Sequence, residues 1–122
     1  MHQEILTMNI DNIMSRDVKS LSSSANLNQA AQIMWEADCG ALPIMDDNNK
    51  LTGMLTDRDI LMAAYTQGAK LADISVDSAM ATVTFTCKAN DDIQQALDTM
   101  QSKQIRRLPV VDDEERLIGI LS

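Results

Sequence analysis

The chain has 122 residues, and 45% of them are hydrophobic but only 2% are aromatic, so Leu, Ile, Val and Met must fill its core. This length suits one compact domain, and the formal net charge of −8 argues against nonspecific nucleic-acid binding, which requires a basic surface. No stretch reaches the apolar length of a membrane span, and the N-terminus has no signal-peptide pattern, so we expect no membrane partner and a cytoplasmic location.

The sequence contains an internal repeat with a constant offset of 66 residues. Met14 aligns with Met80, and the match continues without a gap to Thr56 and Ser122. A gapless match that keeps a Leu-Pro pair, a glycine and an acidic turn in register indicates a duplicated structural unit. We expect the two copies to pack about a pseudo-two-fold axis. The first would comprise residues 1–68 with a lead-in, and the second residues 69–122 with a linker.

The first repeat begins with a short extended stretch that contains Ser20 and Leu21. Asn26 then precedes Gln29 by three residues, which predicts a capping box at the start of an amphipathic helix. Gly40 is the predicted stop of that helix. The second repeat repeats this pattern, with Asp92 and Gln95 at the capping positions.

Each repeat continues with an apolar run, an acidic turn and a second apolar run, which is typical of a β-hairpin. In the first repeat a second helix is predicted from about Thr56 to Gln67, with Gly68 as its stop. The predicted fold is therefore α+β, with two β-α-β-β-α repeats. The second repeat reaches Ser122 without its last helix, so we expect it to be C-terminally truncated.

The sequence contains three motifs, Gly-Met-Leu-Thr-Asp-Arg-Asp at 53–59, Leu-Pro-Val-Val-Asp-Asp at 108–113 and Gly-Ile-Leu-Ser at 119–122. They resemble the cystathionine-β-synthase (CBS) domain, and together with the repeat they make the chain similar to a tandem CBS pair. The resemblance implies a regulatory module that is not an enzyme and that binds adenosine nucleotides (AMP, ADP, ATP, sometimes S-adenosylmethionine) between its repeats. It also implies a homodimer that acts on an effector protein, which the sequence does not identify.

The segment Thr56-Asp57-Arg58-Asp59 is the sharpest candidate for a ligand site. By resemblance, the Thr56 hydroxyl and the helix-start amides would contact phosphate, and Asp59 would accept hydrogen bonds from ribose hydroxyls. A helix N-terminus favours anions, and the Arg58 guanidinium would add positive charge. The same spacing also fits a plain helix cap, in which Thr56 is the N-cap and Asp59 lies near the positive end of the helix.

By the same resemblance, the adenine base would lie against Ser20, Leu21 and the backbone around Pro43 and Ile44. Ordinary strand packing is the alternative for each of these residues.

Arg106 and Arg107 form the only adjacent basic pair in the chain, at the repeat positions that hold Gly40 and Ala41. They would neutralise phosphate across the cleft, or they form a solvated pair that balances the acidic turns. Ser122 aligns with Thr56 and is the candidate phosphate contact of the second repeat, where no counterpart of the Asp59 carboxylate exists.

No constellation for catalysis is present in the sequence, which has no P-loop and only one histidine, His2. Cys39 and Cys87 belong to no CxxC or Cys/His cluster, which indicates reduced thiols and no metal site. We expect no required cofactor, and Mg²⁺ only together with ATP. Two alternatives stay open: a structural dimerisation or docking module without ligand, and a regulatory fragment of a larger enzyme or transporter.

Overall fold

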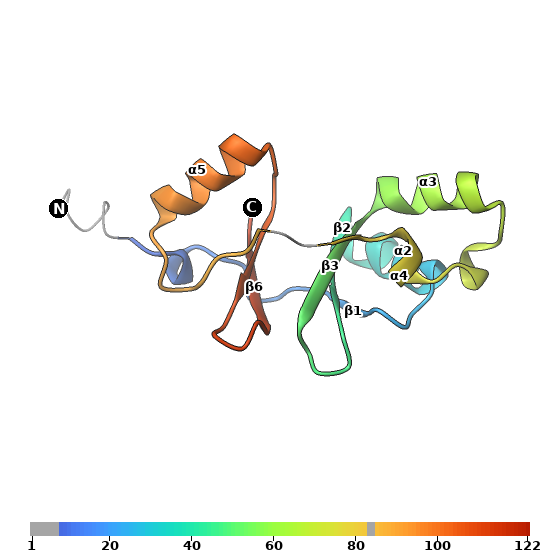
Figure 1. Cartoon of the computed structure of the whole chain (residues 1–122), viewed down its shortest axis with the longest axis horizontal. Coiled ribbons are helices and arrows are strands. Elements are labelled where there is room, and N and C mark those ends of the chain that lie inside the picture. Colours follow the sequence, from blue (N-terminus) through green and yellow to red (C-terminus); the bar gives the residue numbers. More distant parts are fainter. Residues whose placement is uncertain (1–7, 83–84) are drawn as a thin grey trace. The chain divides into compact units, whose positions relative to one another are not determined.

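The computed structural model describes residues 8–82 and 85–122 (Figure 1). The described residues fold into two compact units, one formed by residues 19–82 and the other by residues 8–18 together with 85–122. The lead-in of the first repeat therefore packs with the second repeat, and the segment from 69 to 82 packs with the first. The chain passes from one unit to the other twice.

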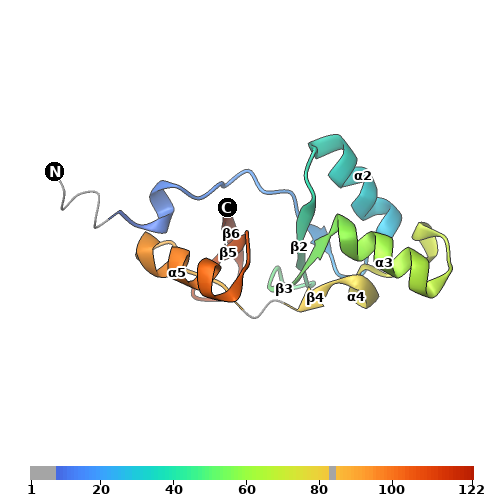
Figure 2. The same cartoon turned by 90° about the horizontal axis from the view of Figure 1, so that it is seen from above.

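The unit of the first repeat is a four-stranded sheet with helices on one side of its central hairpin (Figures 1 and 2). The strands follow the order β1-β2-β3-β4; β1 is parallel to β2, and the other neighbours are antiparallel. The elements are β1 (Leu21–Ser22), α2 (Leu27–Ala37), β2 (Ala41–Met45), β3 (Leu51–Thr56), α3 (Asp57–Gln67), the 3-10 turn η2 (Leu71–Asp73), α4 (Val76–Ala79) and β4 (Ala81–Thr82).

The core of this unit lies between the sheet and α2 and α3. The middle three residues of β2 are all buried, because the strand has a neighbour on both edges and helices over it. The apolar stripe of α2 supplies the opposite wall through Leu27, Ala30 and Met34. The remaining core residues are Leu42, Ile44, Leu55, Ile60, Ala63, Ile74 and Val76.

The unit of the second repeat has the same plan with fewer regular strands. Its hairpin is antiparallel, and Cys87 forms a parallel bridge to Val110 at the position that β1 takes in the first repeat. The elements are the 3-10 turn η1 (Ile10–Asn12), α5 (Ile93–Lys103), β5 (Leu108–Val111) and β6 (Leu117–Leu121). With the first unit this confirms the predicted α+β fold of two tandem repeats.

Equivalent backbone hydrogen bonds hold each lead-in to the opposite repeat. The Ile10 N–H donates to Asp91 O over 3.1 Å, and its counterpart Val76 N–H donates to Ala25 O over 2.9 Å. Both bonds join an apolar residue of the lead-in to the residue before a helix cap. The internal repeat is thus preserved in the hydrogen bonds as well as in the sequence.

Two local predictions are wrong in detail. Helix α2 ends at Ala37 and is capped by Asp38, whose φ of 52° is left-handed, instead of continuing toward Gly40. Asp92 caps α5 by accepting from Gln94 N at 3.2 Å, so the capping box expected with Gln95 does not form there. At the end of α2 the backbone of Asp38 adopts the left-handed conformation that the sequence pattern assigned to a glycine. At the start of α5 the predicted N-cap Asp92 accepts from the amide two residues on instead of three.

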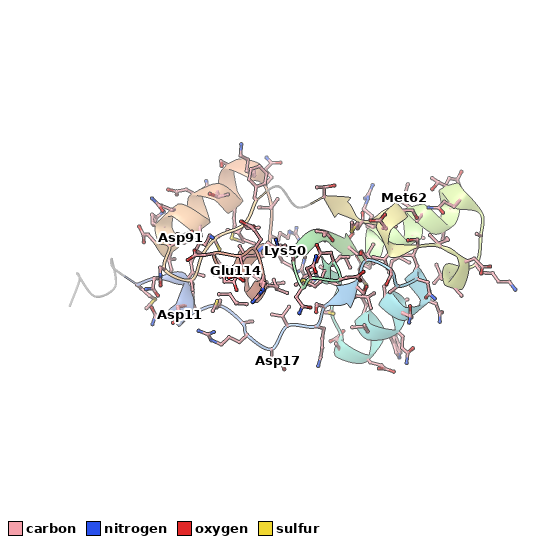
Figure 3. All side chains as sticks on the ribbon, turned by 60° about the horizontal axis from the view of Figure 1, so that its bottom comes forward. Asp11, Asp17, Lys50, Met62, Asp91 and Glu114 are labelled. Carbon is pink, nitrogen blue, oxygen red and sulfur yellow. The ribbon has the colours of Figure 1, made fainter. Side chains whose placement is uncertain are left out.

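The acidic turns are closed by their first aspartate. Asp46 Oδ1 accepts from the amides of Asn48 and Lys50 at 2.8 and 3.0 Å. Asp112 Oδ1 accepts from the amides of Glu114 and Arg116 at 2.8 and 2.9 Å. This geometry explains the turns as backbone caps in solvated loops. Lys50 and Glu114 mark the two turns in Figure 3.

Candidate functional site

The β2–β3 hairpin places Thr56 at the end of a strand and at the start of a helix. Thr56 is the last residue of β3, pairs with Ala41 of β2, and is the N-cap of α3. The hairpin therefore fixes the first turn of α3 against the beginning of β2. Helix α3 ends at Gln67, and Gly68 at φ 62° is its C-cap, as the sequence predicted.

Thr56 and Asp59 exchange two hydrogen bonds. The Asp59 amide donates to Thr56 Oγ1 over 3.1 Å, and the Thr56 amide donates to Asp59 Oδ2 over 2.9 Å. This is a complete capping box. The helix-cap interpretation of the Thr-x-x-Asp spacing is therefore confirmed. Helix α2 has the same arrangement between Asn26 and Gln29.

The two residues between them also satisfy the first turn of α3. The Asp57 amide donates to Gly40 O over 3.0 Å, and the Arg58 amide donates to Asp57 Oδ1 over 2.8 Å. The backbone amides of positions 56 to 59 thus all have partners within the protein. The side chains of Asp57 and Arg58 are both exposed. The Asp57 carboxylate lies close to the backbone of Gly40, where a Cβ atom would be only 3.3 Å from its Oδ2.

A pocket of about 200 Å³ opens beside Asp59, between α3 and α4. Asp59 of α3 lines this pocket, and so does Ser78 of α4, whose hydroxyl accepts from the Gln67 side chain over 3.2 Å. Sequence reasoning missed Ser78 because α4 belongs to the segment between the repeats and carries no motif. The lining residues are Asp59, Met62 (labelled in Figure 3), Ala63, Thr66, Gln67, Ser78 and Ala79.

The residues predicted to contact the base lie together in the same unit. Leu21 of β1 pairs in parallel register with Ile44 of β2, so the two predicted segments are adjacent. Ser20 is exposed and Leu21 is half-buried, whereas the side chains of Pro43 and Ile44 are buried. Ile44 belongs to the hydrophobic core, so only the backbone of this stretch is available to a ligand.

Arg106, Arg107 and Ser122 lie in the other unit. Leu108 pairs with Leu121, so Arg107, which precedes β5, and Ser122, which follows β6, lie at the same end of the hairpin. All three side chains are exposed. The predicted set therefore divides into eight residues of the first unit and three of the second.

Residues 8–82 and 85–122 contain no group of three His, Cys, Asp or Glu side chains arranged to hold a metal ion. In the same part of the chain, no helix is both long enough and apolar enough to cross a lipid bilayer.

Comparison with known families identifies the repeat. The sequence profile of the CBS domain matches residues 10–65 and again residues 72–122. The chain belongs to the CBS domain family. The two matches make it a tandem CBS pair, as its sequence motifs predicted.

Relatives of similar length share the whole CBS pair. Hypoxic response protein 1 of Mycobacterium tuberculosis is 39% identical over 115 residues, which cover 90% of this chain and 76% of that protein. A crystal structure of Hypoxic Response Protein I with two coordinated zinc ions matches with a TM-score of 0.83 at 36% identity, covering 94% and 92% of the two chains. A CBS domain pair solved with 5′-methylthioadenosine and S-adenosyl-L-methionine also gives 0.83, at 25% identity over 95% and 90%.

Some relatives are much longer enzymes. Inosine-5′-monophosphate dehydrogenase of Methanocaldococcus jannaschii is 30% identical over 99% of this chain, but the match covers 23% of the enzyme. CBS pairs thus make up most of some relatives and a small part of much longer enzymes, and one related pair was solved with adenosine derivatives.

Proposed function

We propose that this CBS pair is a regulatory module that senses an adenine nucleotide of the AMP, ADP and ATP class. The ligand would bind in the cleft between the repeats, residues 1–68 and 69–122, and its differential affinity for two packing arrangements would supply the signal, typically about 1–3 kcal/mol. The family membership supports this proposal, as does the related pair solved with two adenosine derivatives.

The observation that carries the proposal is the geometry of Asp59. Only Oδ2 of its carboxylate takes part in the capping box, and Oδ1 accepts no hydrogen bond from the residues that the structure describes. The same side chain is half-buried and borders the pocket between α3 and α4. A carboxylate has enough acceptor sites to cap a helix with one oxygen and bind a ribose hydroxyl with the other. The cap and the ligand role are therefore compatible.

The phosphate would be bound by hydrogen-bond donors that have no partner in the capping of α3. Because the first four amides at the start of α3 have protein partners, we assign the phosphate to side chains instead of to those amides. The Thr56 hydroxyl accepts from Asp59 N and keeps its own proton to donate. The exposed guanidinium groups of Arg58, Arg106 and Arg107 provide charge. The negative charge of Asp57 would compete with the phosphate for these guanidinium groups. Mg²⁺ would bind only together with ATP.

The remaining predicted residues would contact the other parts of the ligand. Ser20, Leu21 and the backbone at Pro43 and Ile44 would contact the base, and Ser122 would contact phosphate in the second repeat. The module would work in the cytoplasm as a homodimer, without a required cofactor, and pass its signal to an effector protein.

Calorimetric titration of the whole chain with AMP, ADP, ATP and S-adenosylmethionine tests the ligand. Asp59→Ala should weaken binding by about 1–3 kcal/mol, because it removes a charged acceptor. It should also lower the melting temperature, because it breaks the capping box. Gln29→Ala is the matched control: it removes the equivalent half of the α2 box and should lower the melting temperature without changing affinity.

A docking module without ligand is the second candidate. The exposed aromatic side chains Trp35 and Tyr65 on α2 and α3 favour it, because large apolar side chains in solvent commonly mark interaction surfaces. Absence of binding by any of the four ligands up to millimolar concentration would select this candidate over the nucleotide sensor.

A further inference from the structure

The pocket between α3 and α4 presents mainly hydrogen-bond acceptors. The two helices lie next to each other within one unit (Figures 1 and 2), and the pocket between them holds about 200 Å³. Its wall consists of one charged side chain, neutral polar side chains and aliphatic groups. Which ligand suits such a pocket depends on the polar atoms that are still free to bind it.

Both hydroxyl groups of the pocket use their proton within the protein. Thr66 Oγ1 donates to the carbonyl oxygen of Met62 over 2.8 Å. Ser78 Oγ donates to the carbonyl oxygen of Ser75, also over 2.8 Å. A hydroxyl group has one proton and two lone pairs, so each of these groups is left with accepting capacity only. Helical Ser and Thr commonly bond a carbonyl oxygen about one turn earlier in this way.

The Gln67 amide and the Asp59 carboxylate add further acceptors. Gln67 Nε2 donates to Ser78 Oγ over 3.2 Å, and the Gln67 carbonyl oxygen accepts no hydrogen bond from the described residues. Oδ2 of Asp59 caps α3, whereas its Oδ1 has no donor in the part of the chain that the structure describes. Each polar side chain of the pocket thus offers an acceptor. Among the side chains that line it, the donor still available is the second amide proton of Gln67.

The pocket also carries a negative charge. Asp59 is the one charged side chain among the described residues that line it, so no lysine or arginine of the lining neutralises the carboxylate. The whole chain has a formal net charge of −8, which attracts cations. An ammonium group has a positive charge, three donors and no acceptor. It is therefore complementary to this pocket in both charge and hydrogen bonding.

The rest of the wall suits a short hydrocarbon chain. Met62 (labelled in Figure 3), Ala63 and Ala79 contribute a thioether and methyl groups. Because one water molecule occupies about 30 Å³ in the liquid, the pocket has room for roughly six or seven groups of that size. A primary ammonium group on a short alkyl chain fits within this space.

We infer that the pocket between α3 and α4 binds a small alkylammonium ion. The ammonium group donates to the free oxygen of Asp59 and to a neutral acceptor of the pocket, and the alkyl chain lies against the aliphatic wall. The site lies within the compact unit of residues 19–82. It uses the same carboxylate as the proposed nucleotide site, but it needs neither the nucleotide nor the second repeat.

NMR titration of the isotope-labelled whole chain with butylammonium chloride tests the site. Sodium chloride at the same concentration controls for ionic strength, and butanol has the same alkyl chain without the charge. Butylammonium should shift the amide signals of residues 59–67 and 78–79. It should bind about tenfold or more tightly than butanol, because charge-assisted hydrogen bonds are the stronger ones. Equal affinity for the two, or no shift beyond that caused by sodium chloride, would overturn the inference.

Asp59→Asn separates the charge from the helix cap. The asparagine keeps a carbonyl oxygen for the Thr56 amide, but the loss of charge should weaken butylammonium binding about tenfold or more. Asp57→Asn is the matched control. Asp57 lies in the same first turn of α3 but lines a different pocket, beside Trp35, so salt should screen its effect to about twofold or less. Equal losses in the two variants would show a diffuse attraction by acidic groups and would overturn the inference.

An alkylammonium group occurs in free amines and in lysine side chains. A lysine derivative blocked at its α-amino and carboxyl groups distinguishes these two sources, because it carries the same ammonium group on a bulkier backbone. Butylammonium should bind more tightly than this derivative. Tighter binding of the blocked lysine would assign the pocket to a lysine of another protein and would overturn the proposal of a small ion.

The ammonium site and the nucleotide sensor can fail separately. The double variant Arg106→Ala with Arg107→Ala should weaken AMP binding and leave butylammonium binding unchanged, because neither arginine lines this pocket. A chain that binds butylammonium but not AMP would support the ammonium site and contradict the nucleotide sensor. A chain that binds AMP but not butylammonium would do the reverse.

Discussion

The sulfur of Met80 packs directly against the backbone of Gly53. A Cβ atom on Gly53 would lie 2.7 Å from that sulfur and 2.6 Å from the carbonyl oxygen of Ala81. The equivalent pair in the other unit is Met14 and Gly119, where a Cβ would lie 2.8 Å from the sulfur. Each glycine therefore lets the lead-in of the opposite repeat approach the hairpin. The same methionine–glycine contact between lead-in and hairpin thus occurs at equivalent positions of both units.

Gly53→Ala should destabilise the protein by about 1–3 kcal/mol, because the added methyl group has no room in a packed interior. The loss should appear as a lower urea midpoint with an unchanged slope. Adding Met80→Ala should not restore stability, since the Ala81 oxygen is backbone and stays at 2.6 Å. Recovery in the double variant would show that the methionine side chain alone sets the limit.

Cys87 should titrate far above an ordinary thiol. Burial, with a smaller effect of the nearby Asp91 charge, raises the pKa of Cys87 from 9.0 to about 11. Because the folded pKa is the higher one, the folded state retains the proton that the unfolded state releases. The stabilising contribution is therefore complete below about pH 9 and is lost as the pH rises toward 11.

Thermal denaturation between these pH values checks this contribution. The wild-type chain should lose stability more steeply than Cys87→Ala, in which the group is absent. Iodoacetamide at pH 8 should modify the half-buried Cys39 before Cys87. Equal alkylation of both thiols would contradict the burial of Cys87.

Asp112 should contribute to acid sensitivity. The amide of Arg116 donates to its carboxylate and, with the Glu114 amide and the charges of Arg116 and Lys88, lowers the pKa of Asp112 below 3.8, against a smaller opposing effect of desolvation. Because the pKa of Asp112 is lower in the folded state, its carboxylate stabilises that state at pH values above the pKa of the unfolded chain. This contribution is lost as the pH falls through the pKa of the folded state.

A carboxyl titration by NMR should therefore place the Asp112 midpoint below that of an ordinary aspartate. Asp112→Asn keeps an acceptor for the turn amides but removes the charge, so its melting temperature should fall less steeply on acidification below about pH 4. An Asp112 midpoint at or above the ordinary value would show that the turn amides do not hold the carboxylate in solution.

The sequence predicts the local elements of this fold well because they depend on neighbouring residues. The capping boxes at Asn26 and Thr56 and the C-cap at Gly68 are short-range patterns with a direct physical cause. The sequence predicts that α2 stops at Gly40, but the helix ends at Ala37 because Asp38 adopts the left-handed conformation that the pattern assigns to glycine.

Contacts between distant segments could not be predicted in the same way. The repeat aligns Met14 with Met80 but does not indicate that each packs on a glycine of the other repeat. A sequence pattern shows which face of an element is apolar, but it does not show which distant residue that face contacts. The same limit applies to the site. Thr56 and Asp59 were found from their motif, whereas Ser78 was not, since it reaches the pocket of Asp59 only through the fold of the linker.

The division of roles at the proposed site can be tested by comparing ligands with and without phosphate. Replacing both Arg106 and Arg107 by alanine should weaken AMP binding about tenfold or more, because charge-assisted contacts contribute roughly 1.5–3 kcal/mol. Binding of 5′-methylthioadenosine should change little, since it has no phosphate for the guanidinium groups to neutralise. Arg116→Ala removes an exposed arginine that pairs with Glu114 over 2.8 Å and should alter neither affinity. Equal losses for both ligands would instead assign the arginine pair to the structure of the cleft, and the phosphate would then fall to Thr56 and Arg58.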